Sequence, residues 1–236
     1  LSAANPGGKL IAGTTAVRSE RFALDPLLQT SAAPAAAGAS SSGMPASAAP
    51  AEEIGPFDLP LTADGTVNIG ETVYKGLAVS DFDLHYRLEN NILTVDRLTG
   101  KVAGGTFHRT ARVDLVKKGL DYRTKVGIAA IQADPLVTAF LPKAAGTLFG
   151  SLTLDTELSG RGTLPAALKK NLSGGGELQV GEGKLTGAGL VRGLADYLQL
   201  DELRSVTFSQ AKGNFRIEDG KLRLDSTVSG HDLRMK

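Results

Sequence analysis

Apolar and polar residues alternate along most of the chain that follows Pro56. Within each run the apolar side chains stand two positions apart, and polar or turn-forming residues fill the places between them. A repeat of two residues is typical of β-strands that bury one face and expose the other. The apolar positions of these runs are Phe57, Leu59, Leu61 and Ala63; Phe82, Leu84, Tyr86 and Leu88; Ala111, Val113 and Leu115; Leu120, Tyr122, Val126 and Ile128; and Leu152, Leu154 and Leu158.

Short turn signals separate the predicted strands. Two-residue turns join antiparallel strands, whereas parallel strands need long crossovers, so the pattern predicts an antiparallel meander. The glycines of 174–176 and 181–183 are predicted to form hairpin turns as well, rather than a phosphate-binding loop. The expected fold class is therefore mainly β (α+β). The turn signals are Glu89-Asn90-Asn91, Gly104-Gly105, Lys117-Lys118-Gly119 and Asp219-Gly220.

A few short helices are expected between the strands. Asp134 is predicted to cap a helical turn over 136–141, because Pro135 suits the first helical position. A second short helix is predicted over 164–171. The longest, over 187–200, has leucines at near-helical spacing close to the C-terminal end. The chain then returns to strands over 206–217 and 221–228.

Composition divides the chain into three parts. Residues 29–55 consist almost wholly of Ala, Ser, Pro and Gly, which bury little surface, so this stretch is expected to be a flexible linker. Residues 56–236 form the predicted β domain. Residues 1–28 are expected to be the tail of a preceding β unit, because residues 22–28 (FALDPLL) echo residues 130–137 (AIQADPLV), each running into an Asp-Pro-Leu cap.

Charge and cysteine content narrow the classes of partner. The chain has 26 Lys and Arg against 25 Asp and Glu, and no basic stripe, so nucleic acid is not an expected partner. It contains no cysteine, which excludes disulfides and thiolate metal sites and fits an oxidising compartment such as the bacterial periplasm. No stretch reaches the ~20 apolar residues that a spanning helix needs, so any membrane anchor is expected outside this sequence.

The search for catalytic chemistry returns no candidate residues. His85, His108 and His231 lack the spacing of a zinc site, and His85 is expected on the polar side of its strand. The carboxylates of 81 and 83, and of 155 and 157, lie two apart on polar faces, where solvation is the simpler interpretation. No enzyme activity, cofactor or metal is therefore predicted.

An ordered series of short motifs resembles the AsmA family of bacterial envelope proteins. Each motif is built from common residue types, and their order along three quarters of the chain carries the resemblance. The motifs are residues 74–82 (YKGLAVSDF), 91–95 (NILTV), 98–105 (LTGKVAGG), 133–136 (ADPL), 174–178 (GGGEL), 183–187 (GKLTG) continuing to Leu194, then Phe208, residues 215–217 (FRI) and residues 219–222 (DGKL).

The resemblance implies a protein anchored in the inner membrane of a Gram-negative bacterium, with a long β-sheet body in the periplasm. It also implies a relationship to bridge-type lipid transporters, with roles in phospholipid transport between the inner and outer membranes and in outer-membrane biogenesis. The expected partners are a phospholipid or other acyl lipid, the inner membrane, and outer-membrane assembly proteins. The alternative is a structural module that docks proteins and regulates outer-membrane protein assembly.

A lipid carrier of this kind needs a long antiparallel sheet, curled so that its apolar face lines a groove. The same alternation would also arise in a closed sandwich, where the apolar face is an ordinary core, and the sequence leaves both readings open. The candidate groove residues are Leu84, Tyr86, Leu88, Val113, Leu115, Val126, Ile128, Leu152 and Leu154.

The linker prediction can be checked by limited proteolysis. A nonspecific protease should cut first within residues 29–55, because a tract without a core offers extended backbone to the enzyme. The expected product is a stable fragment that begins near Pro56, identified by mass spectrometry. First cuts inside the alternating runs would contradict this boundary.

Overall fold

The computed structural model describes residues 2–4, 11–23, 52–186, 205–230 and 234–235. Two short α-helices and one 3-10 turn accompany the strands: α2 (Ala133–Phe140), η1 (Pro142–Ala144) and α3 (Pro165–Asn171). The strands are β1 (Ser2–Ala4), β2 (Ile11–Ala23), β3 (Leu61–Tyr74), β4 (Leu77–Glu89), β5 (Ile92–Val102), β6 (Gly105–Asp114), β7 (Asp121–Gln132), β8 (Leu148–Arg161), β9 (Ser173–Thr186), β10 (Ser205–Glu218), β11 (Lys221–Ser229) and β12 (Arg234–Met235).

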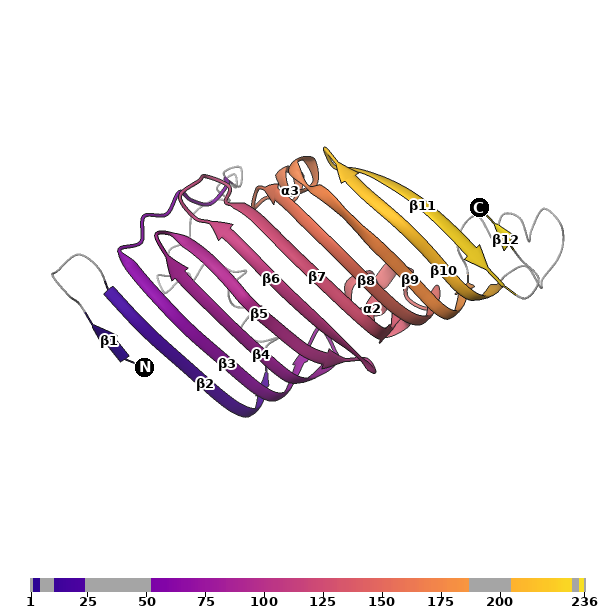
Figure 1. The fold of residues 1–236 in the computed structure, drawn as a ribbon, viewed down its shortest axis with the longest axis horizontal. Coiled ribbons are helices and arrows are strands. Elements are labelled where there is room, and N and C mark those ends of the chain that lie inside the picture. The colour runs from indigo at the N-terminus through magenta and orange to yellow at the C-terminus, as the bar shows by residue number, and fades with distance from the viewer. Residues whose placement is uncertain (1, 5–10, 24–51, 187–204, 231–233, 236) are drawn as a thin grey trace, which may run out of the picture.

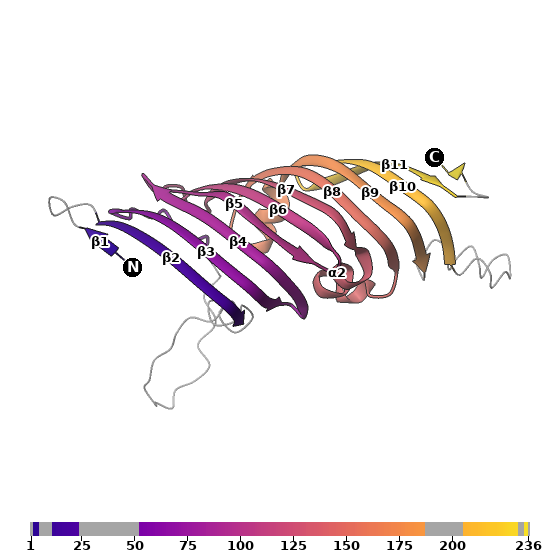
Figure 2. The same cartoon turned by 60° about the horizontal axis from the view of Figure 1, so that its bottom comes forward.

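All described strands belong to one sheet whose spatial order follows the chain order from β1 to β12 (Figure 1). Every neighbouring pair is antiparallel except β2 and β3, which run parallel. The sheet is curled and does not close, and α2 lies on the inner side of the curl (Figure 2). The mainly β class and the meander are therefore confirmed.

Tight turns join most of the long strands. Four of them place two consecutive residues at positive φ, the geometry that matches the twist of a two-residue hairpin. The predicted turns at 90–91 and 219–220 are of this kind. At the predicted Gly104-Gly105 turn, the loop residues are instead Ala103 and Gly104, and Gly105 already begins β6. The fourth turn is Lys75-Gly76.

The prediction that the glycines of 174–176 and 181–183 form hairpin turns is wrong, because all of them lie inside β9. Except for Gly181, where a side chain would meet open space, these glycines allow close packing between strands. A Cβ at Gly183 would lie 2.2 Å from the ring of Phe208, and one at Gly176 would lie 2.2 Å from the carbonyl oxygen of Asp155. Glycine is the residue that lets a ring or a neighbouring backbone approach this closely.

The predicted helix over 136–141 is present as α2 but begins earlier, at Ala133. Gln132 is its N-cap without a side-chain hydrogen bond, so Asp134 is not the cap. The Asp134 carboxylate instead accepts a hydrogen bond from the amide of Gly146 at 2.9 Å, which ties the loop after α2 back to the helix. The helix predicted over 164–171 is confirmed as α3, with Pro165 in its first turn.

Several predicted features fall outside the described residues. They are the helix over 187–200, linker residues 29–51, and the first Asp-Pro-Leu copy beyond Ala23. At the end of the predicted linker, residues 52–55 lie against the sheet: Ile54 accepts a hydrogen bond from Gly119, and the Glu53 carboxylate accepts one from the amide of Thr163. Upstream, β2 pairs with β3 along its length, so residues 11–23 extend the sheet. The three-part division itself stays a prediction.

The core lies where α2 covers one margin of the sheet. Ile131 is 1% exposed and Ala133 is fully buried, and around them two clusters collect side chains from β4 to β10. The positive φ of Ala130 accompanies an irregularity in the β7–β8 register, and this brings Ile131 opposite Leu152. The cluster members are Val79, Val102 and Ile131 in one, and Ala133, Leu152, Val180 and Phe208 in the other.

The covered margin should dominate stability. Replacing Ile131 with Ala should lower the free energy of unfolding by about 2–5 kcal/mol, because it leaves a cavity beneath α2. Leu222→Ala is the control: Leu222 is 65% exposed, and its replacement should change stability by no more than about 0.5 kcal/mol. Urea denaturation measures both, and equal effects would contradict this location of the core.

An ion cluster holds the opposite ends of β7 and β8 together. Arg161 donates two hydrogen bonds to the Asp121 carboxylate, and Lys117 donates one at 2.6 Å. These bonds, those of Arg161 above all, hold the pKa of Asp121 well below its ordinary value. The lowered pKa means that the carboxylate stabilises the fold while it is ionised.

The contribution of Asp121 should therefore depend on pH. With a lowered pKa in the folded state, its stabilisation is fully present above the unfolded pKa near ~4, declines as the pH falls below that value, and is lost only as the pH falls through the lower pKa of the folded state. Asp121→Asn should cost no more than about 1 kcal/mol at pH 7, because the cluster is partly solvated, and a smaller amount at pH 3. Urea midpoints at pH 7, 5 and 3 test this. A difference that stays constant with pH would contradict it, and Asp155→Asn is the control substitution, because Asp155 has no ion-pair partner among the described residues.

Candidate apolar groove

The cross-strand registers place nearly all the large apolar side chains on one face of the sheet. In an antiparallel pair, residues opposite each other project to the same side, so each register defines a row that crosses the sheet. We call this side the apolar face. Its middle row, from β3 to β11, is Val67, Leu84, Leu98, Arg109, Val126, Thr156, Gly176, Phe215 and Leu224.

The adjacent rows have the same character. On the α2 side of the middle row lie Ile69, Phe82, Gly100, Phe107, Ile128, Leu154, Leu178, Gly213 and Ser226. On the other side lie Gly65, Tyr86, Val95, Ala111, Thr124, Leu158, Gly174, Ile217 and Leu222. The result is a largely apolar surface that crosses the strands and is interrupted by the charged side chain of Arg109.

The opposite face carries ion pairs. His85 lies there, as predicted, with Nε2 3.2 Å from a carboxylate oxygen of Asp64 and Nδ1 3.5 Å from one of Asp96. Arg87 donates two hydrogen bonds of 2.8 Å to Asp96 and so lowers the pKa of that carboxyl group. Further pairs link Arg97 with Asp83 and Lys101 with Asp81. This face has the composition of a surface in contact with water.

The predicted groove residues on β4, β6, β7 and β8 share the apolar face. Leu115 follows the end of β6, where its amide donates to the carbonyl of Asn91 at 2.9 Å. Leu152 is 9% exposed and belongs to the core beside α2, and Ile128 packs against both core clusters. The others are half-buried: Leu84, Tyr86, Leu88, Val113, Leu115, Val126 and Leu154.

Half-burial has a direct structural cause. The described residues contain no second layer over these positions, so neighbouring side chains shield them only from the sides. Towards β11 the shielding falls further, and Leu222 and Leu224 are 65% and 52% exposed. Among the described residues, the apolar face therefore forms a closed core at the α2 margin and has no covering element over the rest.

The margin far from α2 is lined by the segment before β3. The amide of Phe57 donates to the carbonyl of Leu115 at 2.8 Å, and that of Leu59 donates to the side chain of Asn91 at 2.6 Å. The segment thus follows the turns that join β4 to β5 and β6 to β7. The segment and α2 thus lie along opposite margins of the apolar face of the curled sheet.

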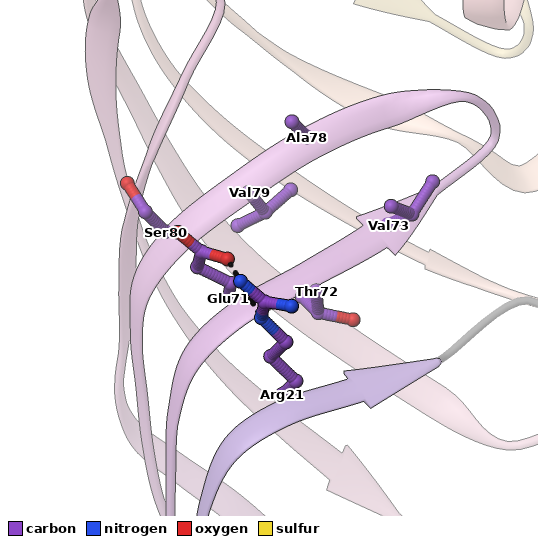
Figure 3. A pocket seen from close by; sticks show the side chains of 7 residues that line it. All are labelled: Arg21, Glu71, Thr72, Val73, Ala78, Val79 and Ser80. Carbon is purple, nitrogen blue, oxygen red and sulfur yellow. Dashed lines mark ion pairs between the residues drawn. The ribbon is translucent and has the colours of Figure 1, made fainter.

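A separate pocket of about 590 Å³ lies where β2, β3 and β4 meet (Figure 3). Arg21 forms an exposed 3.3 Å ion pair with Glu71 across it. Thr72 and Val79 line its wall, and the Thr72 hydroxyl is the one buried side-chain polar atom without a hydrogen-bond partner among the described residues. A single exposed ion pair beside a threonine does not form a nucleophile with its base. The remaining lining residues are Val73, Ala78 and Ser80.

Two further properties of the described residues bear on function. None of their His, Asp and Glu side chains gather into a group of three that could hold a metal ion. None of their helices has the length and hydrophobicity needed to span a membrane.

Comparison with known proteins returns one family. The sequence model of the AsmA family matches residues 28–227. No curated protein matches the chain, and no solved structure does. The matched range contains β3 to β10 and most of β11, which is the part of the sheet that carries the uncovered apolar face.

Proposed function

The chain belongs to the AsmA family, and on that premise we propose that it is a non-enzymatic protein of the bacterial envelope. Its apolar face carries acyl lipid, a phospholipid above all, between the inner and outer membranes, and so contributes to outer-membrane biogenesis. In this proposal the sheet lies in the periplasm and the protein is held at the inner membrane. The proposal rests on the observation that most of the apolar face has no covering element among the described residues, while the opposite face of the sheet is polar.

The physical case rests on the cost of exposing lipid tails. An acyl chain of about 16 methylenes costs on the order of 13 kcal/mol to place in water, at ~0.8 kcal/mol for each methylene. A carrier must therefore cover the chain along its whole path. A curled sheet with one apolar side does this with a single repeated element, and its polar side stays in contact with water.

The dimensions of the sheet suit this task. Neighbouring strands lie ~4.8 Å apart, so the eight strands from β3 to β10 span about 34 Å along the groove. This length compares with the ~30 Å hydrocarbon core of a bilayer. Each strand has 10 to 14 residues, which leaves a broad surface on either side of the middle row.

A second candidate function is protein docking. Among the described residues, β11 pairs with β12 only at Val228 and Ser229, so the rest of its outer edge has no strand partner. Leu222 and Leu224 lie on this edge strand and are largely exposed. An open edge of this kind can accept a strand from another protein, as a scaffold of outer-membrane protein assembly would require.

The lipid proposal predicts opposite outcomes at two positions of the same face. Val113→Asp places a charge on the uncovered part, where the carboxylate keeps its water, so the melting temperature should change little while co-purified lipid is lost. Leu152→Asp buries an unpaired charge in the core, and the fold should lose several kcal/mol of stability. Thermal melting and native mass spectrometry of the purified protein measure both effects.

The control is Thr110→Asp, which adds the same charge to the same strand on the polar face and should preserve both fold and lipid. If Val113→Asp unfolds the protein, the uncovered surface is a core and the lipid proposal fails. If Val113→Asp melts normally and no acyl lipid is found on the wild-type protein, the docking function takes its place.

A further inference from the structure

The apolar face from β3 to β10 contains one charged side chain among its described, cross-strand-paired residues, and that side chain is Arg109 on β6. Its cross-strand neighbours are Leu98 on β5 and Val126 on β7. We propose that Arg109 is the binding site for the anionic headgroup of an acyl lipid in the groove, with a phosphate or carboxylate as the group it binds. This inference rests on the function proposed above.

The guanidinium is positioned by a hydrogen-bonded threonine. Arg109 Nε donates to Thr124 Oγ1 at 3.0 Å, and the same Oγ1 donates to the carbonyl of Thr110 at 2.9 Å. Thr124 is 9% exposed, so the acceptor of Arg109 is itself buried and held by the backbone. These two bonds restrict the direction in which the planar guanidinium can extend from the face.

The rest of the guanidinium has no partner among the residues that the structure describes. No described acceptor lies within hydrogen-bond distance of either Nη atom of Arg109, and no described carboxylate forms an ion pair with it. On the polar face, Arg87, Arg97 and Arg161 each contact an aspartate, whereas Arg112 has no ion-pair partner among the described residues. Arg109 therefore presents its outer N–H groups as free donors.

The stability of the fold does not explain why residue 109 is an arginine. An apolar side chain would continue the row between Leu98 and Val126, whereas a charge there keeps stability only by reaching water, as the exposed Arg109 does. No acidic group is registered on this face between β3 and β10 in the described residues to compete for the charge. Within the described residues, the Arg109 guanidinium thus has no ion-pair partner, its direction is restricted by Thr124, and no acidic side chain shares its face between β3 and β10.

The Arg109 guanidinium and its apolar neighbours determine which class of ligand can bind at this site. A guanidinium binds phosphate or carboxylate with two parallel hydrogen bonds, which are strong because both partners are charged. Apolar residues surround Arg109 along β6 as well, with Phe107 on one side and Ala111 on the other. A ligand that fills the site needs one anionic group and a large apolar body, as an anionic acyl lipid has and free phosphate lacks.

The test compares lipids that differ only in the headgroup. Phosphatidylglycerol and diacylglycerol with the same palmitoyl and oleoyl chains are titrated against the purified protein, and binding is followed by native mass spectrometry. The wild-type protein should prefer phosphatidylglycerol by about tenfold or more, the difference expected for charge-assisted bonds to one guanidinium. Arg109→Gln should remove this preference, leave diacylglycerol binding unchanged, and keep the wild-type melting temperature.

Arg112→Gln is the matched control, because Arg112 lies on the same strand, projects to the polar face and has no ion-pair partner among the described residues. It removes the same charge and should keep the preference. Arg109→Lys should give an intermediate value, since an ammonium group retains the charge but not the paired geometry. Inorganic phosphate at the same concentrations should compete weakly.

The outcomes separate the two proposals. If both lipids bind and Arg109→Gln keeps the wild-type preference, the headgroup site is wrong and the groove stands. If free phosphate competes as strongly as the lipid, Arg109 is a general anion site and the lipid assignment fails. If neither lipid binds the wild-type protein, the proposed groove function fails and the headgroup site fails with it.

Discussion

The constraint on which the rest of this structure depends is the alternation of side chains in one sheet, most of which has no second layer among the described residues. Each cross-strand pair places both side chains on the same face, so a repeat of two along every strand becomes a row across the sheet. Because the rows extend from β3 to β11 despite local register shifts, the apolar side chains collect on one face and the ion pairs on the other. The alternation of side chains along the strands thus gives the sheet one apolar face and one polar face.

A single layer leaves the protein with little to bury, and small additions compensate for this. The helix α2 covers one margin and forms the two clusters around Ile131 and Ala133. Local irregularities in the strands serve the same purpose. At Ala130 the backbone adopts a positive φ and the β7–β8 register shifts, so Ile131 rather than Ala130 enters the core. The fold is thus closed where α2 lies and open elsewhere.

The distribution of charge follows the same division. On the polar face, carboxylates and cations pair across strands, as Arg87 does with Asp96 and Arg97 with Asp83. On the apolar face, Arg109 has a threonine as its hydrogen-bond partner and no carboxylate partner among the described residues. A lone oriented cation in apolar surroundings is a binding feature rather than a stabilising one, because unpaired charge adds nothing to cohesion. The charged residues that stabilise the sheet are therefore different from Arg109, the residue proposed to bind the lipid headgroup.

The sequence by itself determined the features that depend on residues close together in the chain. The period of two located the strands, the Asn90-Asn91 and Asp219-Gly220 turns set the meander, and the helix predicted over 164–171 is present as α3. The face on which Leu84, Val113 and Val126 lie also followed from alternation. The ordered motifs identified the family, whose model matches residues 28–227.

The tertiary structure decided what depends on residues far apart in the chain. Only the packing of α2 shows that Leu152 is core while Val113 is uncovered, because both sit at the same phase of the same pattern. Only the register across β5, β6 and β7 shows that Arg109 interrupts an apolar row. The glycines inside β9 were mistaken for turns for the same reason: the groups they make room for, such as the Phe208 ring, come from other strands. Alternation is local, whereas burial depends on which elements meet in space.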